Sequence, residues 1–288
     1  MRQLLSGKRE GIPYSLSRWT DVPGAKWPWF REALAAGAMV AFDPRTAVPG
    51  RWSLAPEDTL GLVFWTKDPS NLLKDRELLR AYQVKVHVTV TGWVEVEKGA
   101  PDLMSGARLL RETVEVFGSQ NVTWRFSPVP ILPMPELLER FFTIATHAGT
   151  GLSEVFVSFL QTNDLMPESR DADQRRATLV EMAKVVKPLG LKVALCNEDR
   201  SPLGADNLVR GICAPPLVPT HPRETFGEGR KSAEIIIPQV EGCGCVLMAD
   251  PFTINESCTF GCTYCYASDK GLADKKRNTT RRSLEVVG

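Results

Sequence analysis

Short apolar runs alternate with amphipathic stretches along most of the chain. Runs of β-branched and aromatic residues predict strands at residues 60–65, 85–91, 121–126, 154–160 and 191–196, and weaker runs predict strands at 12–17, 39–42 and 247–254. Between them, apolar residues at helical spacing predict helices at about 71–81, 102–117, 135–148 and 172–187. Gly190 follows the last of these, as glycine often does after a helix.

This alternation indicates repeated βα units and a parallel sheet. The expected fold is α/β, a complete or partial (β/α) TIM-type barrel. Residues from about 200 to 242 are rich in Pro, Gly and charge, so they read as a long excursion rather than a second domain. We therefore expect a barrel domain over residues 1–242 and a cysteine-rich segment over 243–288 that closes the same domain.

Polar residues that follow the predicted strands are the first candidates for function. In a parallel barrel the active site lies at the carboxyl ends of the strands. Residues at these ends that could meet at one mouth, and are predicted as catalytic or binding groups, are Arg18, Asp21, Lys67, Arg125 and Glu198. Such a pocket suits an anionic ligand, although charges at a rim can also be simply solvated. Four tryptophans either wall this pocket or pack in the core: Trp19, Trp65, Trp93 and Trp124.

Composition favours an ordinary enzyme. Lys and Arg number 35 against 34 Asp and Glu, so no overall field points to nucleic acid or to a membrane. The N-terminus lacks the apolar stretch of a signal peptide, and the longest apolar run is about half a membrane span. We expect a cytoplasmic protein with no membrane partner, in a reducing compartment that protects thiolate-bound metal.

Three cysteines near the C-terminus are the most informative feature. Cys258, Cys262 and Cys265 follow C-x3-C-x2-C spacing in a loop that also contains a glycine. Complete cysteine ligation of a four-iron four-sulfur cluster takes four thiolates. A set of three therefore predicts a [4Fe–4S] cluster with one iron open to another ligand.

Four further cysteines complete a total of seven. They are predicted to form a second, closed metal site that serves as an auxiliary cluster: Cys196, Cys213, Cys243 and Cys245. Zinc suits four thiolates equally well. For Cys196, which follows an apolar run, a role as a small core residue is the alternative.

The C-terminal motif resembles that of radical S-adenosylmethionine (SAM) enzymes, and its flanking residues look most like the group that includes spore photoproduct lyase. The resemblance implies that SAM binds the open iron, with Tyr264 and Asn255 beside the cofactor, and is cleaved to a 5′-deoxyadenosyl radical. It also implies an electron donor such as flavodoxin or ferredoxin.

A wider set of motifs is similar to one uncharacterised prokaryotic family, domain of unknown function 1848. The motifs are Ser-Arg-x-Thr-Asp-x-Pro at 17–23, Phe-Trp-Thr-Lys-x-Pro at 64–69, Thr-x-Thr-Gly-aromatic at 89–93, Trp-Arg-Phe at 124–126, Cys-x-Glu at 196–198, Cys-Gly-Cys and the final three cysteines. The resemblance covers residues 15–267 and implies that the seven cysteines form one set. Ser127 stands where the family typically has Asp.

The position of the three cysteines is unusual, because radical SAM enzymes carry them after the first strand. A permuted barrel explains the order if residues 247–254 form the strand that is usually first and close against the N-terminal units. The cysteine loop then reaches the same mouth as Arg18, Lys67 and Arg125.

Two features of the sequence indicate a class of substrate. The basic residues after Cys265 and the similarity to a DNA-repair lyase suggest a nucleic-acid base or nucleotide, in a modification or repair reaction. A non-catalytic iron–sulfur or zinc-stabilised nucleic-acid-binding module is one alternative. A zinc-dependent barrel hydrolase is another, although the chain has only three histidines and they are dispersed.

Overall fold

Seven parallel strands form the main sheet in the part of the chain that the structure describes. The computed structural model describes residues 12–17, 20–42, 49–149, 151–160, 171–195, 204–212, 248 and 258–265. Within these residues the strand order is β1-β4-β5-β6-β7-β8-β9, and each neighbouring pair is parallel. The strands are β1 (Ile12–Leu16), β4 (Thr59–Thr66), β5 (Val84–Thr89), β6 (Val122–Phe126), β7 (Glu154–Val157), β8 (Lys192–Leu195) and β9 (Leu208–Arg210).

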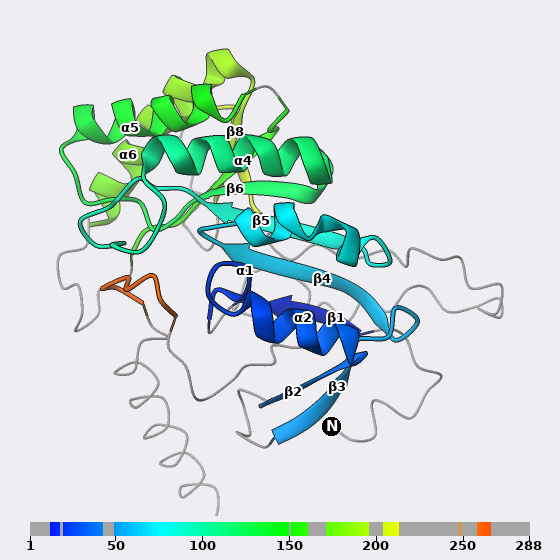
Figure 1. Cartoon of the computed structure of the whole chain (residues 1–288). Coiled ribbons are helices and arrows are strands. Elements are labelled where there is room, and N and C mark those ends of the chain that lie inside the picture. Colours follow the sequence, from blue (N-terminus) through cyan, green and yellow to red (C-terminus); the bar gives the residue numbers. More distant parts are fainter. Residues whose placement is uncertain are drawn as a thin grey trace, which may run out of the picture.

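Helices lie between the successive sheet strands from β1 to β8, and the spatial order of the seven strands follows their order in the chain. The helices are α1 (Val22–Ala25), α2 (Trp27–Ala35), α3 (Ser70–Lys74), α4 (Leu103–Phe117), α5 (Met134–His147) and α6 (Ala172–Val186), with short 3-10 turns η2 (Arg76–Leu79), η3 (Ser119–Asn121) and η4 (Lys187–Leu189). Figure 1 shows α4, α5 and α6 gathered together over the strands β5 to β8. This is the arrangement expected when each parallel connection crosses with the same hand.

The two faces of the sheet differ in what they carry. On the helix-covered face, Trp124 and Phe126 of β6 are fully buried and pack against Phe141 of α5, with ring centroids 5.1 and 4.9 Å apart. Since side chains alternate along a strand, the residues between these core positions leave the sheet on the opposite face. Arg125 of β6 is one of them.

A small antiparallel hairpin lies outside the main sheet. It consists of β2 (Ala38–Phe42) and β3 (Pro49–Ser53), which follow α2. Tyr14 of β1 ties the hairpin to the main sheet, because its hydroxyl donates to the Ser53 carbonyl at 2.7 Å. The strand predicted at 39–42 is therefore present, but it pairs in this hairpin rather than in the parallel sheet.

Most predicted elements are confirmed. The five strong strand candidates correspond to β4 through β8, the weaker run at 12–17 corresponds to β1, and the four helices correspond to α3 with η2, α4, α5 and α6. The parallel sheet of βα units is confirmed as well.

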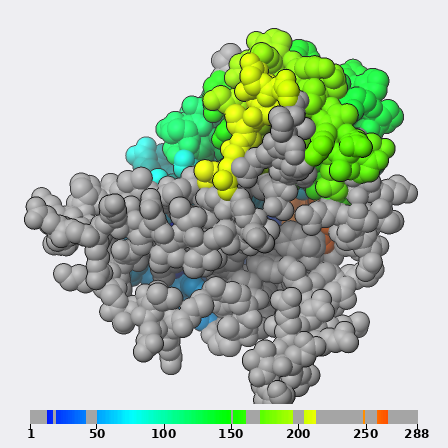
Figure 2. Space-filling model, turned by 180° about the vertical axis from the view of Figure 1, so that it is seen from behind, coloured from blue at the N-terminus to red at the C-terminus, as the bar shows by residue number. Residues whose placement is uncertain are grey.

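The region 200–242 departs from expectation, since it is not only an excursion: β9 lies within it and adds the seventh strand beside β8. Figure 2 shows β9 in yellow at the surface of the molecule. Three residues sufficed for pairing, which is too few for a hydrophobic period to be recognised. The predicted strand at 247–254 lies outside the described residues except for Met248, which is buried.

Among the described residues, the sheet is open. Within the described residues, β1 and β9 are its two edges, and no pair closes it into a barrel. The helices of the described ranges include none long and apolar enough to cross a membrane.

Candidate functional site

Asp21 joins the ends of two strands. It follows β1 and caps α1, where its Oδ1 accepts the backbone N–H of Gly24 at 2.9 Å. Its other oxygen, Oδ2, accepts the backbone N–H of Lys67 just after β4 at 2.7 Å. The carboxyl group therefore fixes the exits of β1 and β4 relative to each other.

Burial dominates the ionisation of Asp21. Its side chain is 8% exposed, and desolvation raises its pKa from 3.8 to about 6. The hydrogen bonds from Gly24 and Lys67 and the nearby charge of Lys67 act in the opposite direction but do not cancel the effect.

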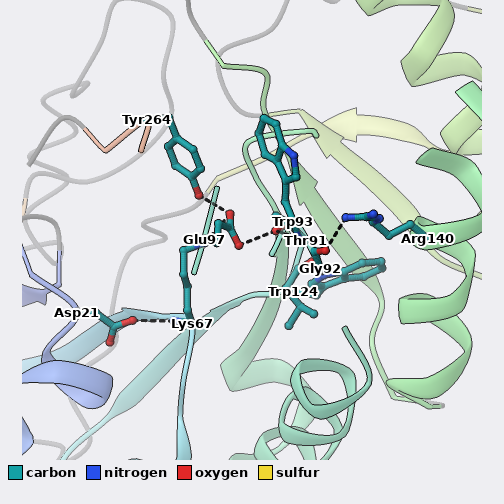
Figure 3. Close-up of polar contacts among 10 residues, drawn as sticks. Asp21, Lys67, Thr91, Gly92, Trp93, Glu97, Trp124, Arg140 and Tyr264 are labelled. Carbon is teal, nitrogen blue, oxygen red and sulfur yellow. Dashed lines mark hydrogen bonds and ion pairs between the residues drawn. The ribbon is translucent and has the colours of Figure 1, made fainter. Parts of the chain in front are cut away.

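Glu97 is the centre of a buried polar network (Figure 3). Its carboxylate is 3% exposed and lies in the loop between β5 and α4. Lys67 Nζ lies 2.8 Å from Glu97 Oε1 as an ion pair, and Thr91 Oγ1 donates to Glu97 Oε2 at 2.7 Å. The hydroxyl of Tyr264 donates a short hydrogen bond to Oε1. One carboxylate thus connects the ends of β4 and β5 with the cysteine loop.

The ring of Tyr264 is held on both sides. It stacks on Trp93 with centroids 6.1 Å apart and an interplanar angle of 19°. Lys67 Nζ lies 5.8 Å from the centre of the same ring, within cation–π range. Burial and then the negative charge of Glu97 raise the pKa of Tyr264, so the phenol stays protonated and remains a donor.

Phe260 anchors the cysteine loop, defined as residues 258–265. Its side chain is 5% exposed and lies against Gly24 of α1, where a Cβ would come within 2.4 Å of the Phe260 ring. The Phe260 backbone lies against Gly99, where a Cβ would come within 2.8 Å of the Phe260 Cα atom. Two glycines therefore make the space in which the loop fits, and Figure 1 shows the loop in orange close to α1.

Backbone hydrogen bonds fix the loop further. Gly99 N–H donates to the Phe260 carbonyl at 2.9 Å, and Thr263 N–H donates to the Val96 carbonyl at 3.0 Å. Gly261 adopts a φ of 60°, a left-handed conformation that glycine takes without strain. The loop is thus attached, through residues 96–99, to the carboxyl end of the sheet.

Two of the three thiols, those of Cys258 and Cys262, are not activated as free nucleophiles. Burial raises the pKa of Cys258, and burial raises the pKa of Cys262 to about 12. These groups are neutral at pH 7 without metal, whereas a reactive cysteine has a lowered pKa. A bound cation deprotonates such thiols. Cys258 also accepts the backbone N–H groups of Phe260 and Asp21, and hydrogen bonds to sulfur are a feature of iron–sulfur sites.

The described side chains do not form a site for a single metal ion. In the described part of the chain, no three His, Cys, Asp or Glu side chains are grouped so as to hold one ion. In a [4Fe–4S] cluster each cysteine binds a different iron, so its thiolates need not converge on one point.

The structure brings together several of the predicted site residues. Asp21, Lys67, Tyr264 and the three cysteines meet at one end of the sheet. The side chain of Arg125, on β6, makes no hydrogen bond or ion pair with these residues in the described part of the chain. Seven predicted residues lie outside the described residues: Arg18, Glu198, Asn255, Cys196, Cys213, Cys243 and Cys245.

The four tryptophans named above differ in their positions. Trp124 is fully buried and donates from Nε1 to the Val90 carbonyl at 3.0 Å, so it is a core residue. Trp93 belongs to the site through its stacking on Tyr264. Trp65 is partly buried on the face away from the helices, and Trp19 lies outside the described residues.

Glu97 and Phe260 were missed as site residues. Glu97 follows the Thr-x-Thr-Gly-Trp motif by four positions in the same loop, where it is the second carboxylate after Glu95, so the sequence identifies an acidic loop but not which of the two residues is buried. Phe260 lies between two of the cysteines, where an apolar residue in a short polar loop indicates an anchor.

Comparison with known proteins gives a family but no activity. The family model described as Domain of unknown function (DUF1848) matches residues 14–267. No curated protein matches. A solved structure of deoxyribose phosphate aldolase from Aeropyrum pernix matches at 17% identity and a TM-score of 0.34, over 52% of this chain and 63% of that chain.

Replacing Gly99 by Ala should displace the cysteine loop. The new Cβ would lie 2.7 Å from the Thr259 carbonyl oxygen, and a backbone atom cannot rotate away as a side-chain end can. We expect a loss of about 1–3 kcal/mol in stability and faster alkylation of Cys258, Cys262 and Cys265, measured peptide by peptide in metal-free protein. Gly50→Ala is the control, because its Cβ would meet nothing closer than 3.4 Å. Equal alkylation rates in the two variants would show that the close packing at Gly99 does not hold the cysteine loop in place.

Replacing Glu97 by Gln should leave the largely buried Lys67 without the carboxylate that pairs with its ammonium group. The expected loss in the free energy of unfolding is about 3 kcal/mol. The exposed Arg108–Glu112 pair, also 2.8 Å apart, provides the control: Glu112→Gln should cost about 0.5 kcal/mol or less. In urea denaturation, adding Lys67→Met to Glu97→Gln should recover most of the loss. A Glu97 variant no less stable than the Glu112 variant would contradict the network.

Asp21 should make stability depend on pH. Its pKa is raised in the folded state, so its contribution is fully present below about pH 4 and is lost as the pH rises through about 6. The loss amounts to about 3 kcal/mol for a shift of this size. Relative to Asp21→Asn, wild-type metal-free protein should therefore lose stability between pH 4 and 7. Asp173→Asn on the exposed side of α6 is the control, and a wild-type-to-Asn difference that does not change with pH would refute the expectation.

Proposed function

The chain belongs to the DUF1848 family, and since that membership brings no reaction with it, we propose from its own residues that the protein is a radical SAM-type enzyme. The observation that supports this most directly is the cysteine loop beside Asp21, Lys67 and Glu97 at the carboxyl ends of β1, β4 and β5. That end of a parallel sheet is where enzymes of this architecture keep their active sites. A loop that only stabilised a terminal segment would need no buried ion pair beneath it.

The cofactor assignment follows from the donor set. Cys258, Cys262 and Cys265 would hold three irons of a [4Fe–4S] cluster and leave the fourth for SAM. When bound, this pair would supply one-electron cleavage of SAM to methionine and a 5′-deoxyadenosyl radical, with the electron from the proposed donor protein, for hydrogen-atom abstraction from the substrate. The protein contributes position and exclusion of competing reactions, while the cofactor carries the difficult chemistry.

The residues around the loop have separate tasks in this proposal. Phe260 and the backbone of Gly99 fix where the three sulfurs lie. Backbone N–H groups at Cys258 and the ammonium of Lys67 near Cys262 offset negative charge on the sulfurs. The hydroxyl of Tyr264 donates to Glu97, so Tyr264 anchors the cysteine loop. In this proposal it also lies beside the cofactor.

The barrel is proposed to be closed by the predicted strand at 247–254. This strand would fill the gap between β9 and β1 and would end shortly before Cys258, whose loop contacts α1 directly after β1. A permuted radical SAM barrel of this kind accounts for cysteines that come last in the sequence.

The remaining assignments rest on the sequence. Cys196, Cys213, Cys243 and Cys245 are proposed to hold the auxiliary cluster, and a flavodoxin or ferredoxin to supply the electron. A nucleic-acid base or nucleotide remains the proposed substrate.

The test is metal analysis after anaerobic purification, followed by reduction in the presence of SAM. Two four-iron clusters predict about eight irons per chain, and radical chemistry predicts 5′-deoxyadenosine as product. Cys262→Ala should lose about four irons and all SAM cleavage. Thr259→Ala, an exposed position in the same loop, should lose neither.

Other outcomes would exclude the proposal. Zinc without iron would favour the metal-stabilised binding module. Full iron content without SAM cleavage would assign the clusters to electron transfer or to structure.

A further inference from the structure

The face of the sheet away from the helices carries its own set of side chains. Ser15, Trp65, His87, Arg125 and Phe156 each alternate with residues of the helix-covered core, so they leave their strands on this inward face. The strand register places Trp65 beside His87, and Arg125 beside Phe156. These residues come from β1, β4, β5, β6 and β7 and share one surface.

Aromatic rings cross this face. Trp65 and His87 are stacked, with centroids 5.1 Å apart and an interplanar angle of 6°. His87 meets Phe156 edge to face at 6.1 Å, although β6 lies between their strands. Gly211, just after β9, leaves room for the Phe156 ring, because a Cβ there would come within 2.6 Å of it. The rings of Phe156, His87 and Trp65 thus form a row, and the Trp65 ring at its end is only partly buried, so a ligand can reach it.

Arg125 is a cation near the carboxyl end of this face; Lys85, at the start of β5 on the same face, donates to the Gln120 carbonyl at 2.7 Å. The Arg125 guanidinium forms no hydrogen bond or ion pair with another residue in the part of the chain that the structure describes. Lys67 differs, since Glu97 neutralises it and Tyr264 lies beside it. Sequence reasoning placed Arg18, Lys67 and Arg125 at one mouth, and of the two that the structure describes, Arg125 is therefore the one left to bind an anion.

A buried hydroxyl on the same face also lacks a partner. Ser15 is 1% exposed, and within the described residues its Oγ makes no hydrogen bond. Buried polar groups normally have a partner, so such an atom is explained by a ligand or water.

We infer that this inward face is the substrate subsite for a flat aromatic ring that carries a phosphate or carboxylate group. The inference rests on the proposed function in placing the substrate beside the cysteine loop, and it deepens that function by naming the class of molecule. The ring stacks beside Trp65, and Arg125 binds the anionic group through its two parallel N–H donors.

Binding to the full-length purified protein tests this directly. The probes are a nucleoside 5′-monophosphate, the same nucleoside without phosphate, inorganic phosphate and indole-3-carboxylate, each measured by calorimetry. Arg125→Gln should weaken the ring-plus-anion probes about tenfold or more, since hydrogen bonds to charged groups are involved, and should leave the nucleoside unchanged. Trp65→Leu should weaken the nucleoside as well. The phosphate and carboxylate probes distinguish which anion is preferred.

Controls keep the test specific. Arg111→Gln changes an exposed arginine of α4 and should leave every affinity unchanged. Arg125→Lys keeps the charge without the planar donors and should give an intermediate affinity, so it carries the test if the Gln variant does not fold. Failure of wild-type protein to bind either ring-plus-anion probe, or equal losses in the Arg111 and Arg125 variants, would overturn the inference.

Two further results separate this inference from the proposed function. Competition between SAM and the nucleotide, with an equal loss of SAM affinity in Arg125→Gln, would place Arg125 in the cofactor site and overturn the substrate assignment. Binding needs no reduced cluster, however. Arg125-dependent binding without SAM cleavage would therefore remove the radical chemistry and leave the subsite standing.

Discussion

The buried carboxylate of Glu97 is the constraint on which the site depends. It accepts from Thr91 and Tyr264 and pairs with Lys67, and these partners belong to three separate parts of the chain. A charge at 3% exposure is costly unless its partners are in place. Tyr264 and Glu97 are 167 positions apart, so this requirement ties the cysteine loop to the sheet more strictly than apolar contact alone would.

Hydrophobic periodicity predicted the frame of the fold because buried parallel strands and long amphipathic helices repeat their signal over many residues. Strands β4 to β8 and helices α4 to α6 are of that kind. The three residues of β9 are too few to carry a hydrophobic period, and β3 was not predicted although its hairpin partner β2 was. Residue type at strand ends identified Asp21 and Lys67, since polar groups after apolar runs are visible in a sequence.

Other parts of the site could not be derived in that way. The pairing of Lys67 with Glu97 joins the exits of neighbouring strands and depends on the register of β4 and β5. Sequence reasoning grouped Lys67 with Arg125 because both are cations after strands, yet one is neutralised and the other faces the inner side of the sheet. The packing of Phe260 depends on the absence of side chains at Gly24 and Gly99, and this steric relation appears only in three dimensions.

The distance along the chain between Glu97 and Tyr264 also has a consequence for biosynthesis. Domains generally fold from their N-terminal end as they are made. The ion pair of Lys67 and Glu97 can form once the first strands are in place, but it stays open to water until residue 264 has left the ribosome. The proposed loading of metal at the three cysteines would therefore be a late event, at a set of strands that has already been assembled.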